Sequence, residues 1–228
     1  MVGKKYRKYW YEVKKYLMDG SNFLSMEKSK NNYEYVWSGK EDKYSKYIEL
    51  APEKLRDYIY DHIFGYFSPL SLLEVGSGAG RNLLDIKMRV GDDVVLQGLE
   101  LTESGVKVCK KRGLNVICSS AGDMPFMDNS FDVVFSVHAL EQMDSILPSV
   151  CSELFRVARL GVILFEPFFC QQNFFGRLHN KRSGYPKDIV GCLVDAGFDI
   201  VFFGIDRSVS GSPVNLTGVC VAKKLKNG

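Results

Sequence analysis

The chain has 228 residues, of which 46% are hydrophobic and 25% are charged, and its formal net charge is +3. This length and composition are typical of one folded domain with a substantial core, and the charge is too small to indicate a nucleic-acid partner. No apolar run reaches membrane-spanning length, and the Lys-rich start continues into Tyr, Trp and charged residues rather than an apolar signal core. The sequence therefore predicts a soluble cytoplasmic protein without a membrane partner.

Six cysteines are spread along the chain, with no C-x-x-C pair and no His/Cys pair at the spacing of metal ligands. This pattern predicts buried, reduced thiols and no metal site. The six are Cys109, Cys118, Cys151, Cys170, Cys192 and Cys220.

Residues 1–50 are rich in Tyr and Lys and poor in aliphatic side chains. Apolar residues between Tyr6 and Leu17 recur at helical spacing, which predicts a short amphipathic helix with a basic start. Lysines interleaved with aromatic residues could also contact phosphates and bases, so a nucleic-acid partner is the alternative for this segment. We predict that residues 1–50 form an N-terminal helical extension ahead of one domain at 51–228.

A helix is expected to begin at Pro52, because proline suits a first helical turn and Leu55, Ile59 and Ile63 share one face. From residue 71 strands alternate with helices, which predicts a doubly wound α/β fold with a mostly parallel seven-stranded sheet. Residues 206–213 are too few for a helical crossover, so the last strand should be antiparallel. The strands are expected near residues 71–75, 94–100, 114–118, 132–137, 161–166, 199–205 and 214–222.

Residues 72–80 read Leu-Leu-Glu-Val-Gly-Ser-Gly-Ala-Gly, an apolar strand followed by glycine at every second position. Gly76 and Gly78 would let the backbone turn tightly and approach a ligand. Gly80 would let the helix that starts at Arg81 pack closely. The pattern favours a nucleoside-cofactor loop, with a plain strand-to-helix connection as the alternative.

Glu74 indicates which cofactor this loop would take. A carboxylate beside the loop would repel a dinucleotide pyrophosphate, and the pattern G-x-G-x-x-G needs a glycine where the chain has Arg81. S-adenosylmethionine carries an ammonium and a sulfonium and no phosphate, so it fits better. Glu74 could bind the ammonium directly or through water, or it could instead cap a neighbouring backbone group.

Glu100 ends the second predicted strand, about 20 residues beyond the glycine loop. At this interval a carboxylate can bind both ribose hydroxyls of a nucleoside. The alternative is a solvated charge at a strand end.

A fourth motif, Met-Pro-Phe-Met-Asp-Asn-Ser-Phe-Asp at residues 124–132, is followed by an apolar strand. Together with the loop and the two acids, it resembles the L-P-F-x-D-x-S-F-D run of the small-molecule group of class I S-adenosylmethionine-dependent methyltransferases. The resemblance covers about residues 50–222 and includes Glu153–Arg159, similar to the helix before the fifth strand of that family. It implies a Rossmann-like fold, S-adenosylmethionine as cofactor and methyl transfer to a small-molecule acceptor.

The resemblance also implies a set of cofactor-binding residues, with two departures from the family. Ser120 stands where the family has Asp or Asn for the adenine amino group, and Gln142 replaces the histidine of the family's L-E-H. The implied residues are Glu74, Gly76, Ser77, Gly78, Gly80, Glu100, Leu101, Ser120, Ala121 and Ser136.

Methyl transfer needs a base only when the nucleophile is a hydroxyl, an acidic carbon or a protonated amine. His138 directly follows the fourth strand, and His179 lies in a predicted long loop, residues 167–179, whose Phe residues either wall an apolar pocket or form a satellite cluster. These two histidines are the catalytic candidates. Glu141, Glu166, Tyr185 or the absence of any base are the alternatives.

Three other functions remain open, namely methyl transfer to RNA, methyl transfer to protein, and cofactor binding without catalysis. Residues 136–139, Ser-Val-His-Ala, lack the N-P-P-Y pattern of base N-methyltransferases. We further predict that residues 1–45 close over the cofactor as a lid, because transfer requires the exclusion of water.

Overall fold

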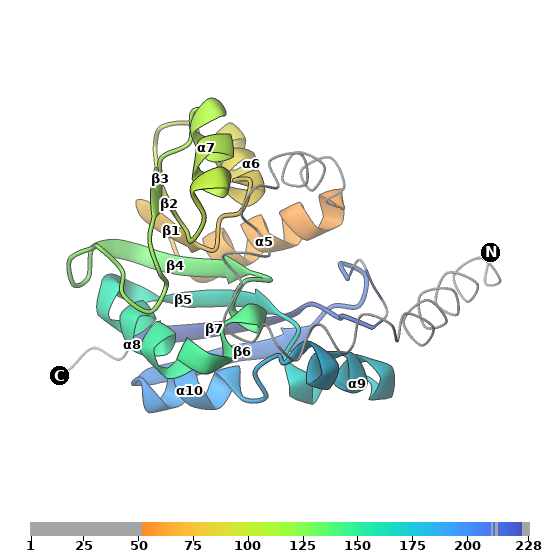
Figure 1. Ribbon diagram of the computed structural model, residues 1–228. Helices are drawn as coiled ribbons and strands as arrows, with labels where there is room; N and C mark the ends of the chain where they lie inside the picture. The colour runs from red at the N-terminus through yellow and green to blue at the C-terminus, as the bar shows by residue number, and fades with distance from the viewer. Residues whose placement is uncertain (1–51, 211, 213, 225–228) are drawn as a thin grey trace.

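The computed structural model describes residues 52–210, 212 and 214–224, and the helix and lid predicted for residues 1–50 lie outside these ranges. The described part is a seven-stranded sheet in the order β3-β2-β1-β4-β5-β7-β6, with helices packed on both faces (Figure 1). The strands are β1 Ser71–Val75, β2 Val95–Glu100, β3 Val116–Cys118, β4 Phe131–Val137, β5 Ala158–Glu166, β6 Phe198–Ile205 and β7 Gly218–Lys224.

The first five strands pair in parallel, and β7 lies antiparallel between β5 and β6. This confirms the doubly wound fold and the antiparallel end of the sheet. The helices are α5 Glu53–Tyr66, α6 Arg81–Val90, α7 Glu103–Lys111, α8 Leu147–Val157, α9 Phe174–Ser183 and α10 Ile189–Asp195, with short 3-10 helices η3 Leu140–Gln142, η4 Asp144–Ile146 and η5 Phe169–Gln171.

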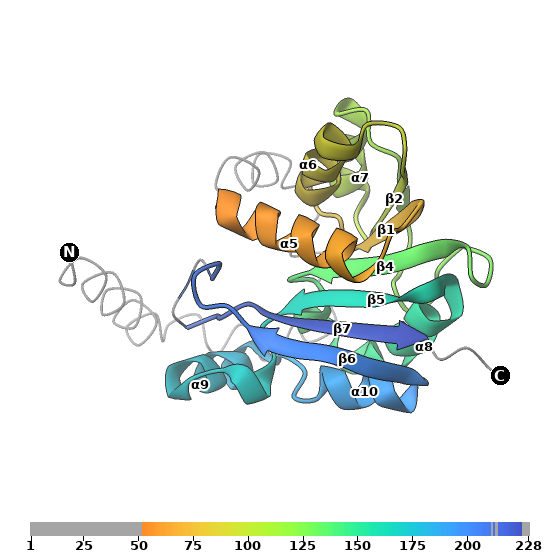
Figure 2. The same cartoon turned by 180° about the vertical axis from the view of Figure 1, so that it is seen from behind.

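Alternation along the strands divides the core between the two faces of the sheet. In β4, Val133 and Phe135 pack with helices α5, α6 and α7, whereas Val134 packs with α8 and α10. Successive side chains of a strand point to opposite faces, so strands covered on both sides become continuously apolar. Figure 2 shows α5 lying along the sheet on the same side as α6.

Several predicted boundaries were wrong. The helix predicted at 153–159 ends at Val157, because Ala158 already pairs with Phe131 and begins β5. β7 begins at Gly218 rather than at residue 214, because the backbone N–H and C=O of Leu216 bond to the Gln172 side chain instead of to a strand. β3 is shorter than predicted.

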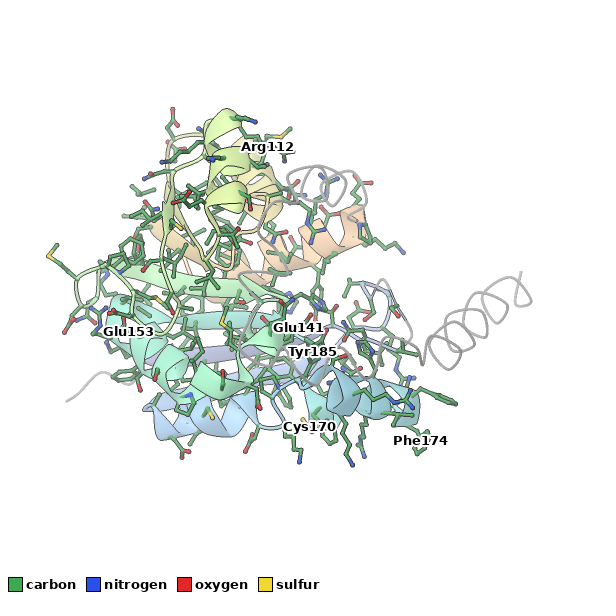
Figure 3. The ribbon with its side chains drawn as sticks, in the orientation of Figure 1. Arg112, Glu141, Glu153, Cys170, Phe174 and Tyr185 are labelled. Carbon is green, nitrogen blue, oxygen red and sulfur yellow. The ribbon has the colours of Figure 1, made fainter. Side chains whose placement is uncertain are left out.

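The segment 167–179 was predicted to be a loop, yet most of it is helical. The Asn173 side chain accepts a hydrogen bond of 2.8 Å from the Gly176 N–H and starts α9, which carries His179. Asn before a helix is a recognised start signal, so the start of α9 is marked in the sequence itself. Phe168 is buried edge-on against Phe203, whereas Phe174 is 76% exposed (Figure 3), so the four Phe residues form no single cluster.

The prediction of six buried thiols was also wrong. All six cysteines are free, but Cys118 and Cys170 are exposed and Cys192 is half-buried. Within the described ranges no helix is both long and apolar enough to cross a membrane. The same ranges contain no cluster of side chains suited to hold a metal ion.

Candidate active site

The glycine loop joins β1 to α6, and its three glycines adopt positive φ angles of 75°, 54° and 73°. A Cβ on Gly76 would lie 2.3 Å from the Cβ of Ala139, so this glycine admits the turn after β4. A Cβ on Gly80 would lie 2.3 Å from Leu114 and 3.0 Å from the sulfur of Cys109 on α7, so the bare Gly80 allows the start of α6 to pack closely against α7 and the segment after it. Gly78 donates its N–H to Glu100 Oε2 at 2.9 Å.

Glu74 is only 1% exposed, and its two carboxylate oxygens are in different situations. Oε1 accepts a hydrogen bond of 2.6 Å from the Asn82 side chain, whereas the buried Oε2 receives none from the described part of the chain. Burial raises the pKa of Glu74 to about 8, against the opposing effects of the Asn82 side chain, Arg81 and the Leu83 backbone N–H. A buried acceptor without a donor is uncommon, and a ligand that brings a donor would satisfy it.

Glu100 is buried, so its interpretation as a solvated charge was wrong. Besides the Gly78 N–H, its carboxylate accepts the Thr102 N–H at 3.1 Å and the Thr102 hydroxyl at 2.9 Å. A carboxylate can accept about four hydrogen bonds, so at least one acceptor position of Glu100 stays available for a ligand. A ligand hydroxyl could also replace the Thr102 hydroxyl as a donor to this carboxylate. Leu101 follows Glu100 and is 44% exposed. It offers an apolar surface of the kind that contacts a nucleobase.

The other cofactor candidates are mostly engaged within the protein. The Ser77 hydroxyl donates to the Glu74 carbonyl at 3.1 Å, and Ser120 Oγ accepts the Gly122 N–H at 3.2 Å. Ala121 is buried, and so is Ser136, which donates to Glu166 at 2.7 Å. Among these, Ser120 alone is half-exposed.

Glu166, at the end of β5, holds the turn that follows β4. Its fully buried carboxylate accepts three consecutive backbone N–H groups, those of Ala139, Leu140 and Glu141, at 3.0, 3.1 and 3.2 Å. Consecutive N–H groups of this kind form an anion-binding nest. Burial raises the pKa of Glu166 to about 7, and Glu141 adds to the increase. The carboxylate thus anchors the turn.

His138 begins this turn with a φ of 54°, in the left-handed region that few non-glycine residues occupy. Its Nδ1 lies 2.9 Å from Glu141 Oε2, and its Nε2 lies 2.7 Å from the Thr217 hydroxyl. Burial alone lowers the pKa of His138, but the carboxylates of Glu141 and Glu166 together raise it above its ordinary value.

Tyr185 donates its hydroxyl to the other oxygen of Glu141 at 3.0 Å, and Figure 3 shows the two residues close together at the edge of the sheet. The His179 ring lies edge-on to Tyr185, 5.6 Å away between centroids, and burial lowers its pKa. The structure therefore brings His138, Glu141 and Tyr185 into one network, with His179 beside it. Sequence reasoning missed Thr217, which carries no local signal.

Comparison with known proteins gives a family for this arrangement. Residues 73–165 match the family model described as "Methyltransferase domain", a range that contains the glycine loop, Glu100 and His138. The chain therefore contains a methyltransferase domain and is similar to the S-adenosylmethionine-dependent methyltransferases. Its cofactor is S-adenosylmethionine.

Individual relatives of this methyltransferase are more distant. It is 28% identical over 185 residues to O-methyltransferase rstn1 of Aspergillus nomiae, covering 74% of this chain and 81% of that protein. It is 40% identical over 74 residues to phthiotriol/phenolphthiotriol dimycocerosates methyltransferase of Mycobacterium tuberculosis, covering 30% of this chain but only 26% of that protein.

Solved methyltransferases share the fold. One from Thermotoga maritima, a possible histamine N-methyltransferase, has a TM-score of 0.61 at 18% identity, covering 81% of this chain and 96% of that one. The N-methyltransferase NodS of Bradyrhizobium japonicum, solved with S-adenosylhomocysteine, has a TM-score of 0.61 at 9% identity, covering 90% and 99%.

The Glu74 carboxylate gives a test of how well this methyltransferase fits its cofactor. An ammonium group placed at the buried Oε2 would supply the missing donor. We expect Glu74→Gln to weaken S-adenosylmethionine binding by about 10- to 100-fold, the scale of a hydrogen bond to a charged group. Titration calorimetry would measure this, with the exposed Glu103→Gln as a matched control. Equal affinity in both variants would contradict the assignment.

The same variant should change how stability depends on pH. Because the folded-state pKa of Glu74, about 8, exceeds its ordinary 4.5, the folded protein binds a proton that the unfolded chain releases. The stability from this proton is complete below pH 4.5 and is lost as pH rises through about 8. Thermal denaturation between pH 5 and pH 9 should therefore show a smaller decline in Glu74→Gln than in the wild type.

Proposed function

We propose that the protein transfers a methyl group from S-adenosylmethionine to a hydroxyl group of a small-molecule acceptor, with His138 as the general base. The observation that carries this proposal is the His138–Glu141 pair at the carboxyl end of β4. An imidazole held by a carboxylate suits the removal of a hydroxyl proton near neutral pH. The O-methyltransferase name of the fungal relative supports a hydroxyl acceptor.

The cofactor would be held by groups at two neighbouring strand ends, those of β1 and β2. We assign Glu74 to the ammonium, Glu100 to the ribose hydroxyls and Leu101 to the adenine. When bound, the cofactor supplies an electrophilic methyl group on a sulfonium. Such a reaction gains most of its rate from orientation, which can contribute about 7–11 kcal/mol, provided that water is excluded. The lid of residues 1–45 and a cytoplasmic location remain parts of this proposal.

A screen of acceptor classes tests the function. The purified protein is supplied with S-adenosylmethionine and with separate pools of phenols and alcohols, of amines, of RNA and of unfolded protein, and release of S-adenosylhomocysteine is measured. We expect release with the phenol and alcohol pool. Release with RNA or protein alone would favour the alternative substrates. Saturable cofactor binding without release in any pool would favour a non-catalytic protein.

A further inference from the structure

Thr217 reaches His138 through the topology of the sheet. It stands directly before β7, whose antiparallel register with β5 sets Gly218 opposite Glu166. The parallel pairing of β4 with β5 brings the end of β4 to the same place. The Thr217 side chain is 2% exposed, and its hydroxyl lies 2.7 Å from His138 Nε2. Two segments 79 residues apart in the chain therefore meet at the base.

Both ring nitrogens of His138 are engaged. When Nδ1 carries the hydrogen and donates it to Glu141, Nε2 accepts the hydrogen of the Thr217 hydroxyl. A hydroxyl also has two lone pairs, and within the described residues His138 is the only hydrogen-bond partner of Thr217 Oγ1. Glu141 and Thr217 thus occupy the two ring nitrogens. If neither partner is displaced, the proton of the acceptor can reach Nε2 only through the Thr217 hydroxyl.

We propose that Thr217 is a catalytic proton relay between the acceptor hydroxyl and His138, an inference that rests on the proposed function. The acceptor oxygen forms its bond to the methyl carbon while the carbon–sulfur bond breaks and leaves its electron pair on sulfur. The acceptor proton passes to Thr217 Oγ1, and the proton that Thr217 carried passes to Nε2. Thr217 ends as it began, and Glu141 stabilises the imidazolium.

Among the residues that the structure describes, the charged groups that act on His138 are Glu141 on η3, Glu166 at the end of β5 and Arg81 at the start of α6. The carboxylates favour the imidazolium and Arg81 opposes it. Thr217→Val alters none of these charges and removes only the hydrogen bond at Nε2. The imidazolium would lose a charge-assisted bond, which is stronger than the bond lost by the neutral ring. The substitution should therefore lower the pKa of His138.

NMR titration tests this contact without an acceptor. The sequence has only three histidines, so the imidazole signals are simple to assign. In the chain of 228 residues with labelled imidazole nitrogens, we expect Thr217→Val to lower the pKa of His138 by about 0.5–1 unit and Thr217→Ser to keep it at the wild-type value. Ser210→Ala removes the 2.9 Å bond to the Thr217 N–H but keeps the hydroxyl, and should leave that pKa unchanged. No shift in Thr217→Val, or an equal shift in Ser210→Ala, would overturn the proposal.

Turnover with the pool of phenols and alcohols distinguishes a proton relay from a side chain that only shields His138 from solvent. A relay predicts that Thr217→Val loses on the order of 10²-fold in rate, while Thr217→Ser stays within about threefold. Equal or faster turnover in Thr217→Val would show that Thr217 only covers the base, and would overturn the relay. If the wild type transfers no methyl group to this pool, the proposed function fails, while the titration still decides whether the hydroxyl controls the imidazole.

Discussion

Replacing His138 by asparagine is expected to lower kcat by about 10²- to 10⁴-fold, the usual contribution of a general base. Asparagine tolerates the left-handed backbone that His138 adopts, with its φ of 54°, so the turn should be kept. Because the cofactor assignments fall on other residues, affinity for S-adenosylmethionine should stay within about twofold. Steady-state kinetics with an acceptor from the screen and calorimetry with the cofactor would measure both quantities.

His62→Asn is the matched control for this variant. His62 lies on α5 and bonds to the Tyr58 carbonyl within its own helix. The His62→Asn variant should lose little activity. Retention of full kcat in His138→Asn would mean that the reaction needs no base at this position, as it would for a neutral amine acceptor.

Glu166→Ala is expected to lower the free energy of unfolding by roughly 3–5 kcal/mol, because several buried donors would lose their partner at a cost of about 1–3 kcal/mol each. For a chain of this size the melting temperature should fall by about 10 °C. Turnover should fall as well, because the N–H groups that follow His138 would no longer be held. Thermal denaturation and activity below the transition would be compared.

Asp132→Ala separates a loss of stability from a loss of the turn. Asp132 is also buried, accepts the Leu70 N–H at 2.8 Å and pairs with Arg159, but it stands near the opposite end of β4. This variant should be destabilised yet keep its turnover below the transition. A Glu166→Ala protein with wild-type turnover and an unchanged pKa of His138 would show that Glu166 does not position the base.

The sequence by itself determined the seven strands in their chain order, most of the helices between them and the positions of the strand-end motifs. Alternation of apolar residues and the glycine loop are local signals, and parallel strands in this fold place their carboxyl ends at one edge. Glu74, Glu100 and His138 each lie at or beside a strand end, so their gathering at that edge followed from the chain order. The helix α9 was within reach too, because its Asn173 cap is a local signal.

Only the tertiary structure decided how these groups are bonded. The sequence left Glu166 as an alternative general base. In the structure its carboxylate accepts the N–H groups of the turn after β4 and holds that turn in place. Tyr185 reaches Glu141 across 44 residues, and Thr217 reaches His138 across 79. Such contacts depend on strand order and register, above all on β7 lying between β5 and β6. Local propensity carries no information on that pairing, because it is fixed by the packing of whole strands against a shared core.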